Sequence, residues 1–178
     1  DEQFCNKWVS FVANPGKGLS WFRDTGYAQL IEEIAKTEGF KPIAVIFNLG
    51  VNDLGNAGNY VSYMTSIAST LKSKNCKLFY MSVNPINSTM ITKSGRGART
   101  EAQVREFNSK IRSGLSLDYK YIDMYSVLMK KGYGTNASYN GTDADSDDGL
   151  HYTTKTFKRI YYYCITYLNT GSINASYY

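Results

Sequence analysis

The chain has one histidine, three prolines and three cysteines in 178 residues, and it has no long apolar run. Its apolar runs, such as Ile43 to Phe47, are far too short to cross a bilayer, and no basic segment followed by an apolar one opens the chain. Cys5, Cys76 and Cys164 form no CxxC pair and are odd in number, so they indicate neither a disulfide framework nor a zinc site. We therefore predict buried free thiols, no membrane span, and no metal or organic cofactor.

A strong excess of one charge sign is also lacking. Twenty Lys plus Arg residues stand against fifteen Asp plus Glu, and the basic residues are scattered along the chain. Because a nucleic-acid interface needs clustered basic residues, we predict no nucleic-acid partner. The length and the 43% of hydrophobic residues are typical of one globular domain over 1–178, with a tail at 169–178. Four N-x-S/T sequons favour an extracellular or cell-surface location.

What the chain does have is an alternation of two hydrophobic periods. Short runs rich in β-branched and aromatic residues are typical of strands that are buried on both faces; they cover 7–14, 43–50, 77–84 and 119–126. Apolar residues at helical spacing fill the windows 30–35, 60–71, 104–115 and 157–168. Thr100 and Gln103 form a capping box at the start of the third of these helices. The alternation predicts an α/β domain with a parallel sheet between helical layers.

The segments that follow the predicted strands are unusually polar and small. They read NPGKGLSW, GVNDLGN and NPINST, and DSDDGLHYT precedes the last predicted helix. In open parallel sheets, ligands bind beyond the carboxyl ends of the strands. We therefore expect these four segments to meet at one rim of the sheet and to form the functional site.

The single histidine, His151, follows Asp148 by three residues. A short turn at this spacing lets the carboxylate bind one ring nitrogen, which fixes the tautomer and leaves the other nitrogen available as a base. The alternative is a histidine at the surface or at a helix cap, with no chemical role. The polar segments around it favour the catalytic interpretation.

Three short motifs together resemble the blocks of the SGNH hydrolase superfamily, also called GDSL-type lipases and esterases. GVND at 50–53 resembles the GxND block, DGLH at 148–151 resembles the DxxH block, and NPGKGLSW at 14–21 resembles the glycine block. Their order along the chain matches the family, and the resemblance extends from about Trp8 to Leu168. It implies a three-layer, flavodoxin-like α/β fold with a parallel sheet.

The resemblance also implies catalytic roles, residue by residue. His151 becomes the general base and Asp148 its orienting partner. Asn52 and Gly18 become the oxyanion donors, and Gly16 is the alternative to Gly18. A side-chain amide and a backbone N–H aimed at a tetrahedral oxyanion each contribute about 3 to 4 kcal/mol to ester cleavage.

Other residues near these motifs are assigned to substrate binding or to structure. We expect segment 82–86 to line the substrate pocket, with Asn84 as its polar contact, and we place Gly50 and Ser20 beside the substrate. Ser20 suits a loop or a helix start better than a relocated nucleophile. The Asp53 carboxylate is expected to be structural and to accept hydrogen bonds from backbone N–H groups of its turn.

The family's nucleophile is a serine in a Gly-Asp-Ser motif at the end of the first strand, and this motif does not occur in the 178 residues. The family pattern places that strand upstream of Asp1 and at the centre of the sheet, so this chain is expected to lack its first strand. A bound N-terminal segment or a strand from a partner chain would complete the sheet. The third possibility is the C-terminal tail, in which Ser172 follows Gly171.

Two further segments have local patterns of their own. The acidic segment 143–149 departs from the spacing of a calcium loop, because its glycine falls one position late, and it is interpreted as a solvated turn that places Asp148. The basic segment 93–99 fits either a mobile surface loop or a contact to an anionic substrate.

These observations predict a serine ester hydrolase that removes small acyl groups, such as acetyl, from carbohydrates. The rival is a non-catalytic SGNH-like binding or assembly module whose sheet is completed by a partner chain. The absent serine favours the rival. The joint presence of Asn52, Asp148 and His151 favours the enzyme.

Overall fold

The computed structural model describes residues 9–37, 42–133 and 149–173, and within these ranges the strands form one parallel sheet. In sheet order the strands are β1 (Ile43–Phe47), β2 (Cys76–Met81) and β3 (Tyr119–Ile122). Val45 lies opposite Leu78 across the first ladder, and Tyr80 lies opposite Tyr121 across the second. All the strands run the same way, so their carboxyl ends share one edge of the sheet.

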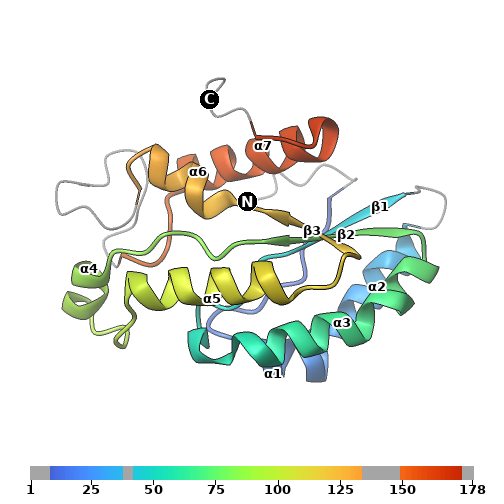
Figure 1. Ribbon diagram of the computed structural model, residues 1–178, viewed down its shortest axis with the longest axis horizontal. Helices are drawn as coiled ribbons and strands as arrows, with labels where there is room; N and C mark the ends of the chain where they lie inside the picture. Colours follow the sequence, from blue (N-terminus) through green and yellow to red (C-terminus); the bar gives the residue numbers. More distant parts are fainter. Residues whose placement is uncertain (1–8, 38–41, 134–148, 174–178) are drawn as a thin grey trace.

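Helices cover both faces of this sheet. They are α1 (Leu19–Trp21), a π-helical turn (Phe22–Gly26), α2 (Tyr27–Lys36), a 3₁₀ turn (Leu54–Asn56), α3 (Ala57–Ser73), α4 (Ser88–Lys93), α5 (Glu101–Gly114), α6 (Met124–Lys130) and α7 (Thr154–Thr170). Figure 1 shows α6 and α7 on one side of the strands and α2, α3 and α5 on the other. The protein is thus a three-layer α/β structure.

The strand side chains divide the core into two clusters. On β2, Leu78 and Tyr80 point into the cluster with the apolar faces of α3 and α5, whereas Phe79 and Met81 point into the cluster with α6 and α7. All four side chains are at most 6% exposed. This alternation with period two is what a central strand of a covered sheet requires.

Most of the predicted elements are confirmed. The run at 43–50 contains β1, the run at 77–84 contains all of β2 except its first residue, and the four helical windows correspond to α2, α3, α5 and α7. The capping box is present: the Thr100 side chain accepts a hydrogen bond from the Gln103 N–H, and the Gln103 side chain accepts one from the Thr100 N–H. The run at 119–126 was predicted too long, because β3 ends at Ile122. Asp123 then caps α6 by accepting a hydrogen bond from the Ser126 N–H at 3.1 Å.

The strand predicted at 7–14 is not observed in the described residues. Residues 9–14 adopt no strand, and residues 7 and 8 lie outside the described ranges. A strand exists only through its ladder of hydrogen bonds, and none of the described residues pairs with 9–14. Phe11 in this segment is 67% exposed, so the apolar pattern that predicted the strand is not matched by burial in the described part of the chain.

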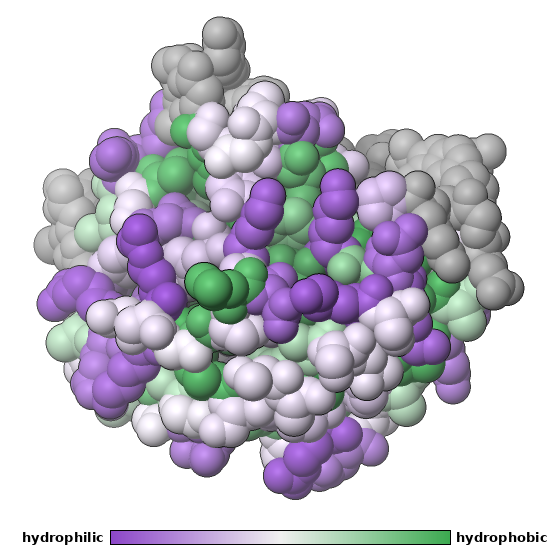
Figure 2. All heavy atoms as spheres, turned by 45° about the vertical axis from the view of Figure 1, so that its right-hand side comes forward, coloured by the Kyte–Doolittle hydropathy of each residue, from purple (hydrophilic) through white to green (hydrophobic). Residues whose placement is uncertain are grey.

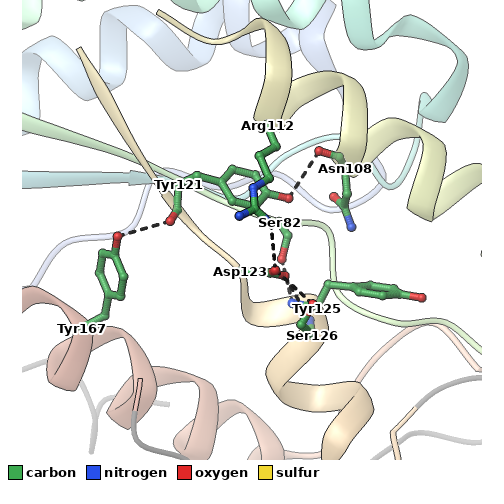
Figure 3. A network of polar contacts seen from close by, with 8 residues as sticks. All are labelled: Ser82, Asn108, Arg112, Tyr121, Asp123, Tyr125, Ser126 and Tyr167. Atoms are coloured by element: carbon green, nitrogen blue, oxygen red, sulfur yellow. Dashed lines mark hydrogen bonds and ion pairs between the residues drawn. The ribbon is translucent and has the colours of Figure 1, made fainter. Parts of the chain in front are cut away.

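A polar network joins the two helical layers at the end of β3. Figure 3 shows Asp123 between Arg112 of α5 and Ser126 of α6, and the Tyr125 N–H donates to the Ser82 hydroxyl at 2.7 Å. From α7, the Tyr167 hydroxyl donates to the Tyr121 carbonyl at 3.2 Å. These bonds hold the chain directly beyond β2 and β3 in a fixed position relative to the helices.

One face of the molecule is mixed in polarity (Figure 2). Figure 2 shows one face on which hydrophilic side chains cover much of the area and hydrophobic ones gather in small groups between them. No helix among the described residues is both long and apolar enough to cross a membrane.

The two cysteines that the structure describes, Cys76 and Cys164, are buried free thiols as predicted, and Cys5 lies outside the described residues. Burial raises the pKa of the Cys164 thiol to about 11.

Candidate active site

The GVND segment makes a tight turn directly beyond β1. The Asp53 N–H donates to the Gly50 carbonyl at 3.1 Å, and Gly50 has a φ of +124°, which only glycine adopts readily. A Cβ on Gly50 would lie 2.2 Å from the ring of Phe107, so the turn also packs directly against α5. Gly50 is buried under this ring. Its position is therefore explained by the backbone and by packing.

The Asp53 carboxylate connects this turn to the glycine segment. One oxygen accepts a hydrogen bond from the Leu19 N–H at 3.0 Å, and the other accepts from the Tyr60 hydroxyl. A backbone N–H is bound, as expected for a structural aspartate, but it belongs to the start of α1 and not to the aspartate's own turn. Burial, and next the bond to Asp53, raise the pKa of Tyr60, so its hydroxyl stays protonated as a donor.

Gly18 is the point of closest approach between the two segments. A Cβ there would lie 2.4 Å from the Asp53 Oδ2 atom, which no real side chain could share. Glycine at this position therefore allows the Asp53 bond to Leu19 to form. Ser20 follows on α1, with its side chain exposed.

The Asn52 side chain is held at both ends of its amide. Its Nδ2 donates to the Lys17 carbonyl at 2.9 Å, and its Oδ1 accepts from Arg99 at 3.1 Å. Arg99 also donates to the Val51 carbonyl at 2.9 Å. The structure thus brings Asn52 into direct contact with the segment that contains Gly18.

Two backbone donors near Asn52 are candidates for a role in binding an oxyanion. Within the described ranges, the N–H groups of Gly16 and Gly18 have no hydrogen-bond acceptor. Gly16 is exposed in a turn with a φ of +72°, whereas Gly18 is half-buried beside Asp53. The choice between them stays a prediction.

The segment beyond β2 is clamped by two polar side chains of α5. Asn108 accepts from the Val83 N–H at 2.8 Å and donates to the Val83 carbonyl at 2.9 Å. The buried Glu101 carboxylate accepts from the Ile86 N–H at 3.1 Å and from the Tyr125 hydroxyl. Between these clamps, the Oδ1 atom of Asn84 is buried and has no hydrogen-bond partner among the described residues.

His151 lies beside the same segment. The Asn87 N–H donates to the Gly149 carbonyl at 2.8 Å, and the Tyr152 hydroxyl donates to the Pro85 carbonyl. These bonds place the exposed His151 next to the chain beyond β2, one strand away from the turn of Asn52. Its predicted partner Asp148 lies outside the described residues.

A pocket of 230 Å³ opens beside Asn52. It lies between the turn beyond β1, the basic segment 93–99 and the start of α5; it is lined by Val51, Asn52, Leu54, Gly55, Arg96, Gly97, Ala98, Arg99 and Gln103. None of the described residues that line it is acidic. Among the described residues, no cluster of three or more His, Cys, Asp or Glu side chains is arranged to hold a metal ion.

Four residues that shape the site were not singled out from the sequence: Tyr60, Arg99, Glu101 and Asn108. For two of them, the sequence pattern could have indicated a role. Glu101 and Asn108 lie on the apolar stripe of α5, where polar side chains are buried and must find partners. Arg99 binds Val51 and Asn52, which are 48 and 47 residues away, so nothing local indicates these partners. Tyr60 binds Asp53 seven residues before it, but its place on the apolar stripe of α3 indicates only packing.

The family comparison agrees with these motifs and their placement. A family model described as GDSL-like Lipase/Acylhydrolase matches residues 5–163. The chain belongs to this family. No curated protein matches the chain.

Membership in the GDSL family supports an α/β fold and a hydrolase of the acylhydrolase type. The observed sheet order is β1-β2-β3, and residues 9–14 pair with none of the described strands.

Proposed function

We propose that this GDSL family protein is a serine ester hydrolase that removes small acyl groups, such as acetyl, from carbohydrates. The observation that carries the proposal is the fixed amide of Asn52 at the carboxyl end of β1. With one Nδ2 hydrogen bound to Lys17, the other has no acceptor among the described residues. A pre-oriented donor of this kind suits a developing oxyanion.

In the proposed reaction, a serine hydroxyl attacks the ester carbonyl while His151 takes its proton. The carbonyl oxygen gains negative charge, which Asn52 and the Gly18 N–H stabilise as donors. His151, oriented by Asp148, then returns the proton to the leaving alcohol. Water attacks the acyl-serine in the second half-reaction, again with His151 as the base. Apart from this water molecule and the ester, each step uses only side-chain and backbone groups of the protein.

The nucleophilic serine is proposed to come from an upstream segment that forms a strand beside β1. Within the described residues, β1 pairs only with β2, and we place the upstream strand at its other edge. Ile46 of β1 is half-buried, so its side chain still has apolar surface to cover. A strand pairing there would end at the same rim as Asn52, which is where the attack must occur.

The carbohydrate substrate is inferred from the character of the rim. The pocket beside Asn52 contains amide, guanidinium and glycine groups, which suit the hydroxyl groups of a sugar better than a long acyl chain. Ser20, Asn84 and Gly50 are proposed to lie beside the substrate. The extracellular or cell-surface location stays a prediction from the sequons.

The test of the proposed base is His151→Ala, assayed with p-nitrophenyl acetate on the full-length protein. We expect turnover to fall to background while the melting temperature is unchanged, since His151 is exposed. Thr154→Ala, an exposed change on the first turn of α7, is the matched control and should leave turnover intact. Unchanged turnover in the His151 variant would refute the role of the histidine.

A further inference from the structure

Arg99 reaches from the basic segment 93–99 into the turn beyond β1. Its Nε donates to the Val51 carbonyl at 2.9 Å, its Nη2 to Asn52 Oδ1 at 3.1 Å, and its Nη1 to the Arg96 carbonyl at 2.7 Å. The side chain is partly buried. A single guanidinium therefore binds two consecutive residues of the GVND turn and the segment from which it comes.

We infer that Arg99 is the positioning residue of Asn52, and that it sets the orientation and donor strength of the amide in catalysis. This inference rests on the proposed role of Asn52 as an oxyanion donor. Arg99 itself is assigned no contact with the reacting atoms. Its effect on the reaction passes through Asn52.

An asparagine amide can adopt two orientations that exchange its oxygen and its nitrogen, because the two ends have similar shape. Here the two neighbours of the amide determine which orientation it adopts. A guanidinium has only donors, so it requires Oδ1 on its side, and the Lys17 carbonyl requires Nδ2 on the other side. If Arg99 were absent, only the Lys17 carbonyl would hold the amide, so the amide would be less firmly oriented and its Nδ2 hydrogen less well aimed at the oxyanion.

The contact between Arg99 and Asn52 also affects how strongly the Asn52 Nδ2 group donates a hydrogen bond. A hydrogen bond from a charged guanidinium is stronger than one from a neutral donor. By drawing electron density toward Oδ1, it polarises the amide and makes the remaining Nδ2 hydrogen a better donor, as in other chained hydrogen bonds. The fork of an arginine is needed for this arrangement, since one lysine ammonium cannot hold the carbonyls of Val51 and Arg96 and Asn52 Oδ1 in the same plane.

A double-mutant cycle tests the inference: Arg99→Ala, Asn52→Ala and the double variant are compared for kcat and KM on p-nitrophenyl acetate, with the full-length protein. We expect Asn52→Ala to lower kcat by about 10² to 10³. Arg99→Ala should lower kcat about 10- to 100-fold with little change in KM, as expected when a reacting group is misplaced. In the Asn52→Ala background, the loss of Arg99 should cost no further kcat.

The thermal midpoint of each variant separates positioning from folding. A merely structural Arg99 would lower the midpoint and kcat equally in both backgrounds, and this additive result would overturn the inference. Arg99→Lys retains the charge without the fork, so it should remain folded and have a kcat between that of the wild type and that of Arg99→Ala; wild-type kcat in this variant would also count against the inference. Arg23→Ala, a change of another arginine on exposed surface, should leave kcat intact.

Failure of the proposed function gives a different pattern. If Asn52→Ala leaves kcat unchanged, Asn52 is not an oxyanion donor, whatever Arg99 does. If Asn52→Ala has its full effect and the Arg99 effect is additive, only the positioning role of Arg99 is wrong.

Discussion

Gly18 and Asp53 show how single residues determine the geometry of the site. The carboxylate of Asp53 lies so close to Gly18 that a methyl group would approach its Oδ2 atom to 2.4 Å. The same oxygen holds the Leu19 N–H at the start of α1. The position of the glycine segment relative to Asn52 therefore depends on the absence of a side chain at residue 18.

Gly18→Ala should lower the free energy of unfolding by about 1 to 3 kcal/mol, as overpacking does, and should reduce turnover because the segment moves away from Asn52. Urea denaturation and an ester assay measure the two effects. Gly58→Ala is the matched control: a Cβ there meets nothing within 4 Å, and alanine favours the helix α3. Equal stability and activity of the two variants would contradict the steric account.

Among the elements, α5 does the most to organise the rim. Its Asn108 and Glu101 hold the segment beyond β2, and its Phe107 packs under the turn beyond β1. The capping box at Thr100 fixes where this helix begins, directly after Arg99. One helix thus sets the distance between the two strand ends that carry Asn52 and Asn84.

Asn108→Ala should destabilise the protein by about 2 to 4 kcal/mol, because it leaves the N–H and the carbonyl of the buried Val83 without partners. Urea denaturation gives the change in the free energy of unfolding. Asn59→Ala, on the exposed face of α3, is the control and should change it by less than about 0.5 kcal/mol. If the two variants were equally stable, the hydrogen bonds between Asn108 and Val83 would not contribute to the free energy of unfolding.

For the whole molecule, hydrophobic periodicity was enough to predict the sheet and its main helices. Local pattern and final burial agree for β2, which is buried on both faces along most of its length, and for the apolar stripes of α3 and α5. In β1, Val45 and Phe47 are buried, but Ala44 on the other face is exposed and Ile46 is half-buried. The segment 9–14 has the same kind of pattern but no strand, since pairing depends on a neighbour that the sequence of the segment cannot reveal. The strand is absent because the segment has no pairing partner among the described residues, although its residue types favour a strand.

The site could be predicted only as far as its short motifs extend. GVND and the glycine segment were expected to meet, and the bond from Asn52 to Lys17 joins them. Arg99 could not be assigned from the sequence, because its partners lie 47 and 48 residues away and depend on how the basic segment folds over the rim. The structure places part of that segment at the pocket beside Asn52, and its contact with a substrate stays a prediction.

The central claim is that the protein hydrolyses esters through an activated serine on a strand beside β1. Labelling the native full-length protein with a fluorophosphonate, followed by mass spectrometry of the labelled peptide, tests it most directly. We predict one labelled serine on a peptide upstream of Asp1, and loss of the label in the His151→Ala variant. Label on Ser20 or Ser172 would contradict the placement of the nucleophile, and a folded protein that takes no label would contradict the enzyme itself.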